Sequence, residues 1–340
     1  MYLQQRQTDN YDASRFSFDG VDRSSVFELE YHTKNLCFFV VNYERLHAVS
    51  LLFEDEASRA LFVELILWRL AGHLHVKLST NNQRYWKLFE EALAVPSEPS
   101  RFNYKSMFGP LEHFEEFEFS DRKLTVDTWA GNLANVFLLK QYFFERENVQ
   151  ICPKRNDHVV DAGSCFGDTA LAFAVAVGAE GHVYTFDPLG SHAEIVRHNI
   201  AQNQLQDRIR FFPVGLGADA NEVPGPVKEG HVVDPGFCLD QAGGTDLVPI
   251  RTIDGLVAAG DIPRVDFLKM DIEGFELAAL QGAEKTLRQF KPRLAISIYH
   301  KFTDFFKIPS FIHSLDLGYR FYLDHYSIHS EETVLYTDAG

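Results

Sequence analysis

The sequence predicts an α/β protein whose main domain is built on a largely parallel sheet, preceded by an amino-terminal α+β region. Strand and helix patterns alternate from His158 to the end of the chain. The expected strands are 158–162, 182–186, 208–214, 265–270 and 293–299, and the expected helices are 168–177, 191–203, 253–259, 274–288 and 309–316. Such alternation is typical of parallel strands joined by helical crossovers. Two further strands, 319–325 and 333–337, are separated by a short turn, so they are expected to form an antiparallel hairpin.

The first half of the chain has less regular patterns. An apolar run over 36–41 predicts a strand, whereas 55–70 has helical spacing, with acidic residues in its first turn and Gly72 after its end. The stretch 114–129 alternates in the manner of a β-hairpin, and 132–146 returns to helical spacing. We place the main boundary at this hairpin, with residues 1–120 as an accessory region and residues 121–340 as the main domain.

The composition is that of an ordinary globular protein, and it argues against several kinds of partner. The formal net charge is -16 and no block is rich in Lys and Arg, so a nucleic-acid partner is not expected. No segment is apolar over the roughly 20 residues that a membrane span needs, and the amino terminus lacks a signal-peptide pattern. The cysteines form no C-x-x-C pair, which predicts neither a disulfide framework nor a cysteine zinc site. The expected location is the cytoplasm.

The stretch 158–170 reads HVVDAGSCFGDTA, which is a strand followed by a glycine turn and a helix start. Such a turn can direct backbone N–H groups and the positive end of a helix dipole at an anion. A dinucleotide fingerprint needs a third glycine so that a pyrophosphate can approach, whereas Ser164, Cys165 and Phe166 fill this loop. A pyrophosphate is therefore not expected, and a smaller carboxylate, such as that of a methionyl group, fits better.

Two acidic residues follow strands of the predicted sheet. Asp187, in TFDP, can accept hydrogen bonds from both ribose hydroxyls. The alternative is that Asp187 only caps a turn before Pro188. Lys269 and Asp271 share one face of their strand, and Asp271 lies at its carboxyl end, where ligands of open α/β sheets bind. A helix cap is the alternative role for Asp271 and the favoured role for Glu273.

Four motifs in this order resemble the FkbM family of S-adenosylmethionine-dependent methyltransferases, namely DAGSCFGDT, TFDP, DFLKMDIEGFELAALQGA and PRLAISIYH. The similarity extends over roughly residues 135–340, and KMDIEGFE followed by LQGA is its most specific part. It implies a class I methyltransferase (Rossmann-like) fold, in which a seven-stranded sheet has an antiparallel last strand. It also implies S-adenosylmethionine as the cofactor.

The resemblance places the cofactor at the loops after the first two strands of the main domain. Asp187 would hold the ribose, where the family commonly has Glu, and Phe166 is expected to pack beside the cofactor. Asp168 and Thr169 would close the helix start. The full set of implied cofactor-binding residues is Asp161, Gly163, Ser164, Cys165, Phe166, Gly167, Asp168, Thr169, Asp187 and Pro188.

Methyl transfer to a hydroxyl requires that the acceptor lose its proton. The candidate bases follow predicted strands and are Asp271, His300 and His325, with Lys269 beside Asp271; of these, His300 acting alone is favoured over a metal. A divalent metal held by Asp271, His300, His325 and His329 is the alternative, which the resemblance does not demand.

The expected activity is the transfer of a methyl group to a hydroxyl of a glycan, polyketide or other secondary metabolite. Tyr299, Phe302, Phe305 and Phe306 can stack on such an acceptor, and 215–249 is either a lid or a passive insertion. An NAD-dependent oxidoreductase and a non-catalytic protein of the same fold are the alternatives, and the missing third glycine counts against the first. Residues 1–120 are expected to shape the acceptor pocket, to form a homodimer face, or both.

Overall fold

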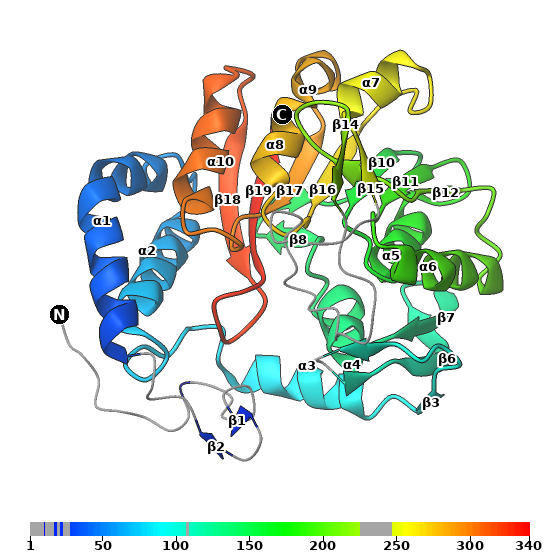
Figure 1. The fold of residues 1–340 in the computed structure, drawn as a ribbon, viewed down its shortest axis with the longest axis horizontal. Coiled ribbons are helices and arrows are strands. Elements are labelled where there is room, and N and C mark those ends of the chain that lie inside the picture. Colours follow the sequence, from blue (N-terminus) through cyan, green and yellow to red (C-terminus); the bar gives the residue numbers. More distant parts are fainter. Residues whose placement is uncertain (1–9, 11–16, 19–20, 23–27, 107–108, 225–246) are drawn as a thin grey trace.

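A seven-stranded sheet forms the centre of the molecule (Figure 1). The computed structural model describes residues 10, 17–18, 21–22, 28–106, 109–224 and 247–340. The sheet consists of β10 (His158–Ala162), β11 (His182–Phe186), β12 (Ile209–Phe212), β16 (Phe267–Met270), β17 (Arg293–Ser297), β18 (Arg320–His325) and β19 (Thr333–Asp338). Their order is β12-β11-β10-β16-β17-β19-β18, and β19 is antiparallel to both of its neighbours. The predicted fold class, including its antiparallel last strand, is confirmed.

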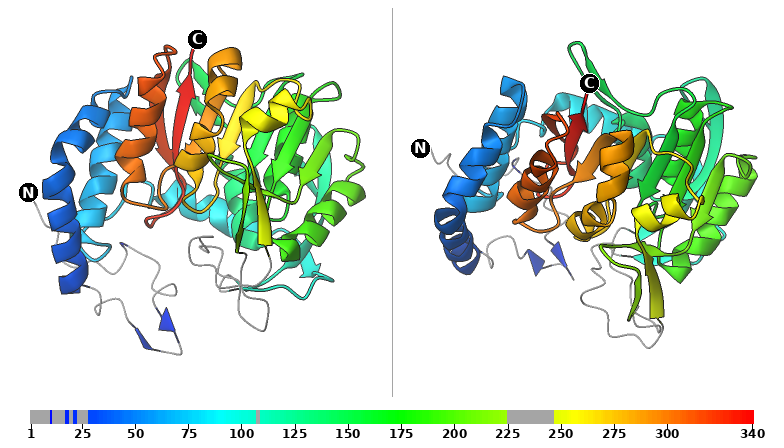
Figure 2. Two further views of the ribbon diagram at one scale, coloured as in Figure 1. Left: turned by 45° about the horizontal axis from the view of Figure 1, so that its top comes forward. Right: turned by 90° about the horizontal axis from the view of Figure 1, so that it is seen from above.

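Helices cover both faces of this sheet. Successive residues of a strand point to opposite sides, so each strand contributes apolar side chains to the core on either face. Val160, Leu268 and Ile296 belong to the apolar core beneath α7 (Ile253–Ala258), α8 (Glu276–Gln281), α9 (Glu284–Phe290) and α10 (Asp304–Ser314). Their neighbours Val159 and Phe267 belong to a second core, against α5 (Asp168–Val177) and α6 (Gly190–Gln202). Figure 2 shows the two helical layers from other sides. The sheet is therefore buried on both faces, as expected for parallel strands with helical crossovers.

The predicted helix 274–288 is two helices, α8 and α9, which meet at Gly282. A Cβ at Gly282 would lie 2.1 Å from the carbonyl oxygen of Gly217, so the chain comes too close there for any side chain. The carboxylate of Asp254, in α7, caps the start of α9, because it accepts hydrogen bonds from the N–H groups of Lys285 and Thr286 at 3.0 and 2.8 Å. A long-range contact thus divides a segment whose local pattern is continuous.

The predicted strand 36–41 is wrong, because this run lies inside the helix α1 (Glu28–Ser50). Short apolar runs do not distinguish a strand from a helix by periodicity. Within α1, Phe38 stacks on Phe302 with ring centroids 4.4 Å apart, whereas Val40 is 67% exposed. The helix predicted over 55–70 is confirmed as α2 (Glu56–Ala71), which Asp55 caps by accepting from the N–H of Ser58.

The two amino-terminal helices cover the outer edge of the sheet (Figure 1). Phe53, between α1 and α2, forms a parallel bridge to Phe321 of β18, and the N–H of Glu54 donates to the Phe321 carbonyl at 3.0 Å. The Ser58 hydroxyl accepts from the N–H of Leu323 at 2.9 Å. Because β18 is otherwise an edge strand, these contacts satisfy backbone groups that would be open to another chain.

The rest of the amino-terminal half includes α3 (Gln83–Leu93), β3 (Ser97–Pro99), β6 (Glu112–Phe119) and β7 (Arg122–Thr128). The predicted hairpin 114–129 is confirmed as β6 and β7, and β7 lies against α5 and α6. The short pairs β1 (Ser17–Phe18) with β2 (Val21–Asp22), and β4 (Lys105–Ser106) with β5 (Gly109–Pro110), complete this half. Division of the chain at residue 120 stays a prediction, and residue 120 lies in the turn between two paired strands.

The helix predicted over 132–146 is only partly present. It consists of α4 (Ala130–Asn132) and the π-helix η2 (Leu133–Leu138), and the chain then extends into β8 (Phe144–Arg146), which pairs with β9 (Val149–Ile151). Phe144 is buried between the rings of Tyr322 and Tyr336, with centroids 5.5 and 4.9 Å away. Packing of this ring outweighs the local helical pattern.

The stretch 215–249 begins and ends in a small sheet formed by β13 (Gly215–Leu216), β15 (Leu247–Arg251) and β14 (Asn221–Pro224). Residues 225–246, which include most of the predicted lid, lie outside the described residues. No helix among the described residues is both long enough and apolar enough to cross a membrane.

Candidate functional site

A hollow opens at the carboxyl ends of β10, β11 and β16. Its lining is Gly163, Cys165, Phe186, Asp187, Pro188, Leu189, His192, Val214, Gly215, Leu216, Asp271, Ile272, Glu273 and Phe275. This is the end of a parallel sheet at which ligands of α/β proteins bind. The hollow brings together five of the residues that the sequence predicted for the site, namely Gly163, Cys165, Asp187, Pro188 and Asp271.

Gly163 allows two strands to approach at the floor of the hollow. Its φ is +83°, and a Cβ would lie 1.7 Å from the carbonyl oxygen of Asp271. The N–H groups of Gly163 and Ser164 both donate to the carbonyl of Phe186, at 2.9 and 3.1 Å. The prediction that the N–H groups of this loop hold a carboxylate is therefore wrong for these two groups, which are already used.

Asp161 lies beneath the loop and is fully buried. One of its oxygens accepts from the hydroxyls of Thr169 and Thr185, both at 2.9 Å, and the other lies 3.2 Å from the Nζ of Lys269. Burial alone would lower the pKa of Lys269, but Asp161 and Asp271 outweigh it and raise that pKa. Lys269 is therefore a buried cation that also donates to the carbonyls of Ala162 and Gly163. Such a cation is no proton acceptor, and a catalytic role for Lys269 stays a prediction.

Asp168 occupies the start of α5. Its carboxylate accepts from the Thr128 hydroxyl at 2.9 Å, the Asn132 amide at 2.8 Å and the N–H of Thr169 at 3.0 Å. Burial raises the pKa of Asp168. The expected closing role of Asp168 and Thr169 agrees with these contacts. The anion at this helix start is thus supplied by the chain itself.

Phe166 is completely buried, and its ring packs away from the hollow. It meets Trp129 and Tyr104 edge to face, with centroids 4.7 and 5.2 Å apart, and lies 5.0 Å from the ring of His192. The prediction that Phe166 packs beside the cofactor is wrong, because aromatic residues from the amino-terminal half enclose the ring. Cys165 does line the hollow, and burial raises its thiol pKa well above the usual value, so the thiol stays protonated.

Asp187 follows β11 and is 5% exposed. Its Oδ1 accepts from the N–H of Leu189 at 2.9 Å, and its Oδ2 lies 3.1 Å from the Nδ1 of His192. A carboxylate can accept about four hydrogen bonds, so each oxygen keeps capacity for a ligand hydroxyl. The turn-cap role and the ligand role are therefore compatible in this residue.

Asp271 lies at the end of β16, surrounded by hydrogen-bond donors. The hydroxyls of Tyr142 and Tyr299 donate to it at 2.7 and 3.1 Å, and the Nε2 of His300 lies 3.3 Å from its Oδ1. Tyr142 follows the π-helix η2, a type of helix that often occurs at functional sites. These contacts fix the orientation of the Asp271 carboxylate beside the hollow.

His300 stands among three carboxylates, with nitrogen-to-oxygen distances of 3.3 Å to Asp271, 3.2 Å to Glu273 and 3.0 Å to Glu276. Burial alone would lower the pKa of His300, but Glu276 and the other carboxylates outweigh it and raise the pKa well above the usual value. Three carboxylates at these distances favour the charged imidazole. This argues against His300 as the general base, because a protonated imidazole cannot accept the acceptor's proton.

His325 is also excluded as a base, for the opposite reason. Burial lowers its pKa to about 3, and both ring nitrogens are engaged, at 2.8 Å from the Thr333 hydroxyl and 3.0 Å from the His329 carbonyl. The predicted metal set is corrected as well, since the described His/Cys/Asp/Glu group close enough to share an ion is Asp271, Glu276 and His300. Of the predicted ligands, His325 and His329 lie outside this group.

Two acidic residues of the site were missed at the level of the sequence. Glu273 lines the hollow, and burial raises its pKa to about 6. No side chain caps the start of α8, and the carboxylate of its first residue, Glu276, accepts from the N–H of Ile272, before the helix, at 2.7 Å. Glu332 lies near Asp271, and burial followed by the charge of Asp271 raises its pKa to about 8. No local pattern distinguishes these residues from ordinary surface acids.

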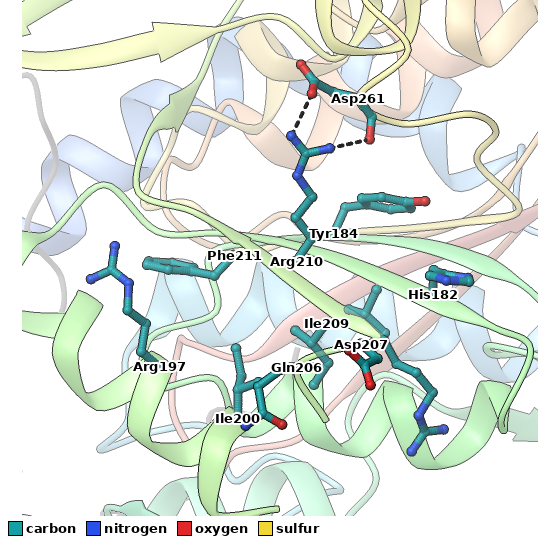
Figure 3. A pocket seen from close by; sticks show the side chains of 12 residues that line it. His182, Tyr184, Arg197, Ile200, Gln206, Asp207, Ile209, Arg210, Phe211 and Asp261 are labelled. Carbon is teal, nitrogen blue, oxygen red and sulfur yellow. Dashed lines mark hydrogen bonds and ion pairs between the residues drawn. The ribbon is translucent and has the colours of Figure 1, made fainter. Parts of the chain in front are cut away.

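A second hollow lies beside β12, at the edge of the sheet (Figure 3). Its arginines are engaged within the protein. Arg210 pairs with Asp261 at 2.6 Å, Arg208 donates to the carbonyls of Ala174 and Gly178, and Arg197 lies over the ring of Phe211. It contains none of the residues predicted for the site. We therefore take the hollow lined by Asp187 and Asp271 as the functional one.

Comparisons with known proteins agree with this geometry. Residues 161–321 match the family described as the methyltransferase FkbM domain. The crystal structure of methyltransferase FkbM from Methylobacillus flagellatus KT is similar over 90% of this chain and 62% of its own, with 19% identity and a TM-score of 0.56. This chain thus spans less than two thirds of that protein's length. No curated protein matches the chain.

Two other solved structures have lower TM-scores. A methyltransferase from Geobacter sulfurreducens has 18% identity and a TM-score of 0.31, over 54% of this chain and 70% of its own. An O-methyltransferase from Bacillus cereus in complex with SAH has 13% identity and a TM-score of 0.33, over 54% of this chain and 74% of its own. On a sheet of this strand order, residues 161–321 are therefore similar to the methyltransferase FkbM domain.

Proposed function

We propose that the protein is an S-adenosylmethionine-dependent O-methyltransferase that acts on a hydroxyl of a glycan, polyketide or other secondary metabolite. The observation that carries this proposal is the joint lining of one hollow by Asp187 and by Asp271 with Glu273. The first carboxylate suits a ribose, and the other two suit an acceptor that loses a proton. The family match supports the same reaction class.

The residues of the hollow fit the proposed cofactor. Asp187 keeps hydrogen-bonding capacity for ribose hydroxyls, and Leu189, Val214 and Leu216 offer apolar surface for an adenine ring. When bound, S-adenosylmethionine supplies a methyl group on a sulfonium. Gly163 keeps the floor of the hollow free of a side chain, so that the ligand can lie close to the backbone of two strands. A nicotinamide dinucleotide is less well supported, because the loop lacks the glycine that a pyrophosphate needs.

Glu273 is the better proton acceptor of the two carboxylates. A general base works best with a pKa near the working pH, and burial raises that of Glu273 to about 6. Each oxygen of Asp271 already accepts from a tyrosine hydroxyl, at 2.7 Å from Tyr142 and 3.1 Å from Tyr299, so Asp271 is better placed to orient the acceptor. We assign Asp271 the alignment of the acceptor hydroxyl and Glu273 the removal of its proton.

The charges of the site favour a neutral acceptor over an anionic one. Asp271, Glu273 and Glu276 surround His300, with distances of 3.0 to 3.3 Å to its ring nitrogens. Carboxylates and tyrosine hydroxyls are suitable partners for the hydroxyls of a sugar or polyketide, whereas a phosphate would meet like charge.

The test begins with calorimetric binding of S-adenosylmethionine and S-adenosylhomocysteine to the purified protein. A panel of hydroxylated acceptors is then screened by mass spectrometry for the gain of one methylene. We expect Glu273→Gln and Asp271→Asn to retain cofactor binding while turnover falls by about 10²-fold or more. Glu284→Gln, on the exposed face of α9, is the matched control. Binding of neither cofactor form contradicts the proposal, and binding without turnover on any acceptor indicates a non-catalytic relative.

A further inference from the structure

A chain of hydrogen bonds connects the amino-terminal half of the protein to the carboxylate that faces the hollow. The hydroxyl of Tyr104 lies 2.8 Å from the Nε2 of His192, and the Nδ1 of His192 lies 3.1 Å from the Oδ2 of Asp187. All three residues are buried, with exposed fractions of 8%, 5% and 5%. Tyr104 lies before the hairpin of β6 and β7, far in the sequence from His192 and Asp187.

One tautomer of the neutral His192 ring fits both contacts. An ionised carboxylate only accepts, so the Nδ1 of His192 carries the hydrogen that Asp187 receives. In a neutral ring the Nε2 is then an acceptor, and the Tyr104 hydroxyl donates to it. Burial raises the pKa of Tyr104, which keeps that hydroxyl protonated. The arrangement therefore holds one tautomer of His192 and one orientation of the carboxylate.

Aromatic packing keeps this chain in place. The ring of Phe166, inside the glycine loop, lies against both Tyr104 and His192, with centroids 5.2 and 5.0 Å apart. Trp129 packs on Phe166 and donates from its ring N–H to the carbonyl of Gly109 at 3.2 Å. The same contacts thus hold the glycine loop and the hydrogen-bonded chain, which gives the buried Phe166 a role that its sequence position does not suggest.

We propose that Tyr104 and His192 are positioning residues for the ribose of the bound adenosyl ligand, acting through Asp187. This inference rests on the proposed function, because it assigns Asp187 to an adenosyl ligand. With Leu189 occupying one lone pair of Oδ1 and His192 one of Oδ2, both oxygens keep a free lone pair for the two ribose hydroxyls. Loss of the Tyr104 hydroxyl frees the imidazole to turn, and the carboxylate loses its orientation.

The test measures binding of two ligands by calorimetry, S-adenosylhomocysteine and its 2′,3′-dideoxy analogue. We expect Tyr104→Phe to weaken binding of the first about three- to tenfold, as one buried hydrogen bond would, and binding of the analogue less than about twofold. His192→Asn retains an N–H near the position of Nδ1 and is expected to behave like Tyr104→Phe, whereas His192→Phe removes both contacts and weakens binding further. The double variant Tyr104→Phe with His192→Asn is expected to lose no more than either single variant.

Tyr319→Phe is the matched control, because the buried Tyr319 hydroxyl donates to the Pro292 carbonyl at 2.9 Å in another part of the molecule. We expect it to bind both ligands as the unaltered protein does. Equal weakening of both ligands in Tyr104→Phe, or no weakening, overturns the inference alone. Failure of the unaltered protein to bind either ligand overturns the proposed function and the ribose role together.

A second measurement requires no ligand. Nitrogen chemical shifts of the His192 ring report its tautomer, and we expect hydrogen on Nδ1 in the unaltered protein and a mixture of tautomers in Tyr104→Phe. Hydrogen on Nε2 in the unaltered protein contradicts the direction of both hydrogen bonds and overturns the inference, whatever the binding data show.

Discussion

Two histidines of this chain differ in pKa because of what surrounds them. His300 faces three carboxylates, which raise its pKa well above the usual value, whereas burial, with Arg69 nearby, lowers the pKa of His325 to about 3. Both follow or end a strand of the main sheet, and neither position reveals its neighbours. The chemical role of an imidazole therefore depends on the folded surroundings more than on its place in a motif.

The raised pKa of Glu332 leads to a prediction about stability and pH. Burial and Asp271 raise its pKa to about 8 from the usual 4.5, so the folded state holds a proton that the unfolded state releases above pH 4.5. Stability should therefore fall as the pH rises from about 5 to about 8, with a slope of at most about 1.4 kcal/mol per pH unit for this group.

The test compares the native protein with Glu332→Gln, whose side-chain oxygen can still accept from the Gln141 amide. Urea unfolding at pH 5, 6.5 and 8 should show that the variant gains stability relative to the native protein as the pH rises. A constant difference across this range would contradict the raised pKa.

The sequence predicted the location of a residue in the fold well where the local backbone determines it. Gly163, Asp187 and Asp271 each come at the end of a predicted strand, and parallel strands bring these ends to one edge. Glu273, His192 and Tyr104 were missed as site residues, because their partners lie far away in the sequence or in another layer. A contact between residues that are far apart in the sequence produces no periodic pattern in it.

At the scale of elements, periodicity succeeded where a helix or strand packs along its whole length. α5 has the predicted bounds, and β10 and β11 do as well. The predictions failed at 36–41, a predicted strand that is part of the helix α1. They also failed after residue 138, where a predicted helix is replaced by a strand whose Phe144 packs on the rings of Tyr322 and Tyr336. α8 and α9 were predicted as one helix because the contact of Gly282 with Gly217 is not local.

The cap of α9 can be tested directly. In Asp254→Ala the N–H groups of Lys285 and Thr286 and the Thr286 hydroxyl lose their acceptor. We expect the free energy of unfolding to fall by about 1 to 2 kcal/mol, as for other lost helix caps. Asp261→Ala removes a surface ion pair with Arg210 and should cost less than about 1 kcal/mol. Equal effects in chemical denaturation would argue against the capping role.

For the whole molecule, the amino-terminal helices are joined to the site end of the sheet. Arg69 of α2 is 5% exposed and donates to the carbonyls of Tyr299 at 3.3 Å and of Ser330 at 2.8 Å. Its guanidinium lies 4.6 Å from the ring centroid of Phe305. One side chain thus bridges the segment after β17, which bears His300, and the turn before β19, which bears Glu332.

Replacement of Arg69 should therefore loosen both segments. In Arg69→Met the two carbonyls lose a charged donor, and we expect the free energy of unfolding to fall by about 3 kcal/mol. Arg84→Met, at an exposed position of α3, should change it by less than about 0.5 kcal/mol. Hydrogen exchange should show faster exchange around residues 298–301 and 327–333 in Arg69→Met only. Unchanged exchange there would contradict the bridging role.

The sequence by itself determined the fold class of this protein, the antiparallel last strand of its sheet and the strand ends at which the candidate site lies. These features follow from local periodicity, from turn residues and from motifs whose spacing is set by the backbone. Tertiary structure decided the charge of His300 and His325, the burial of Phe166 and the bonding of Tyr104 to the carboxylate of Asp187 through His192. The physical reason is that desolvation, ion pairing and aromatic packing depend on groups brought together only by folding.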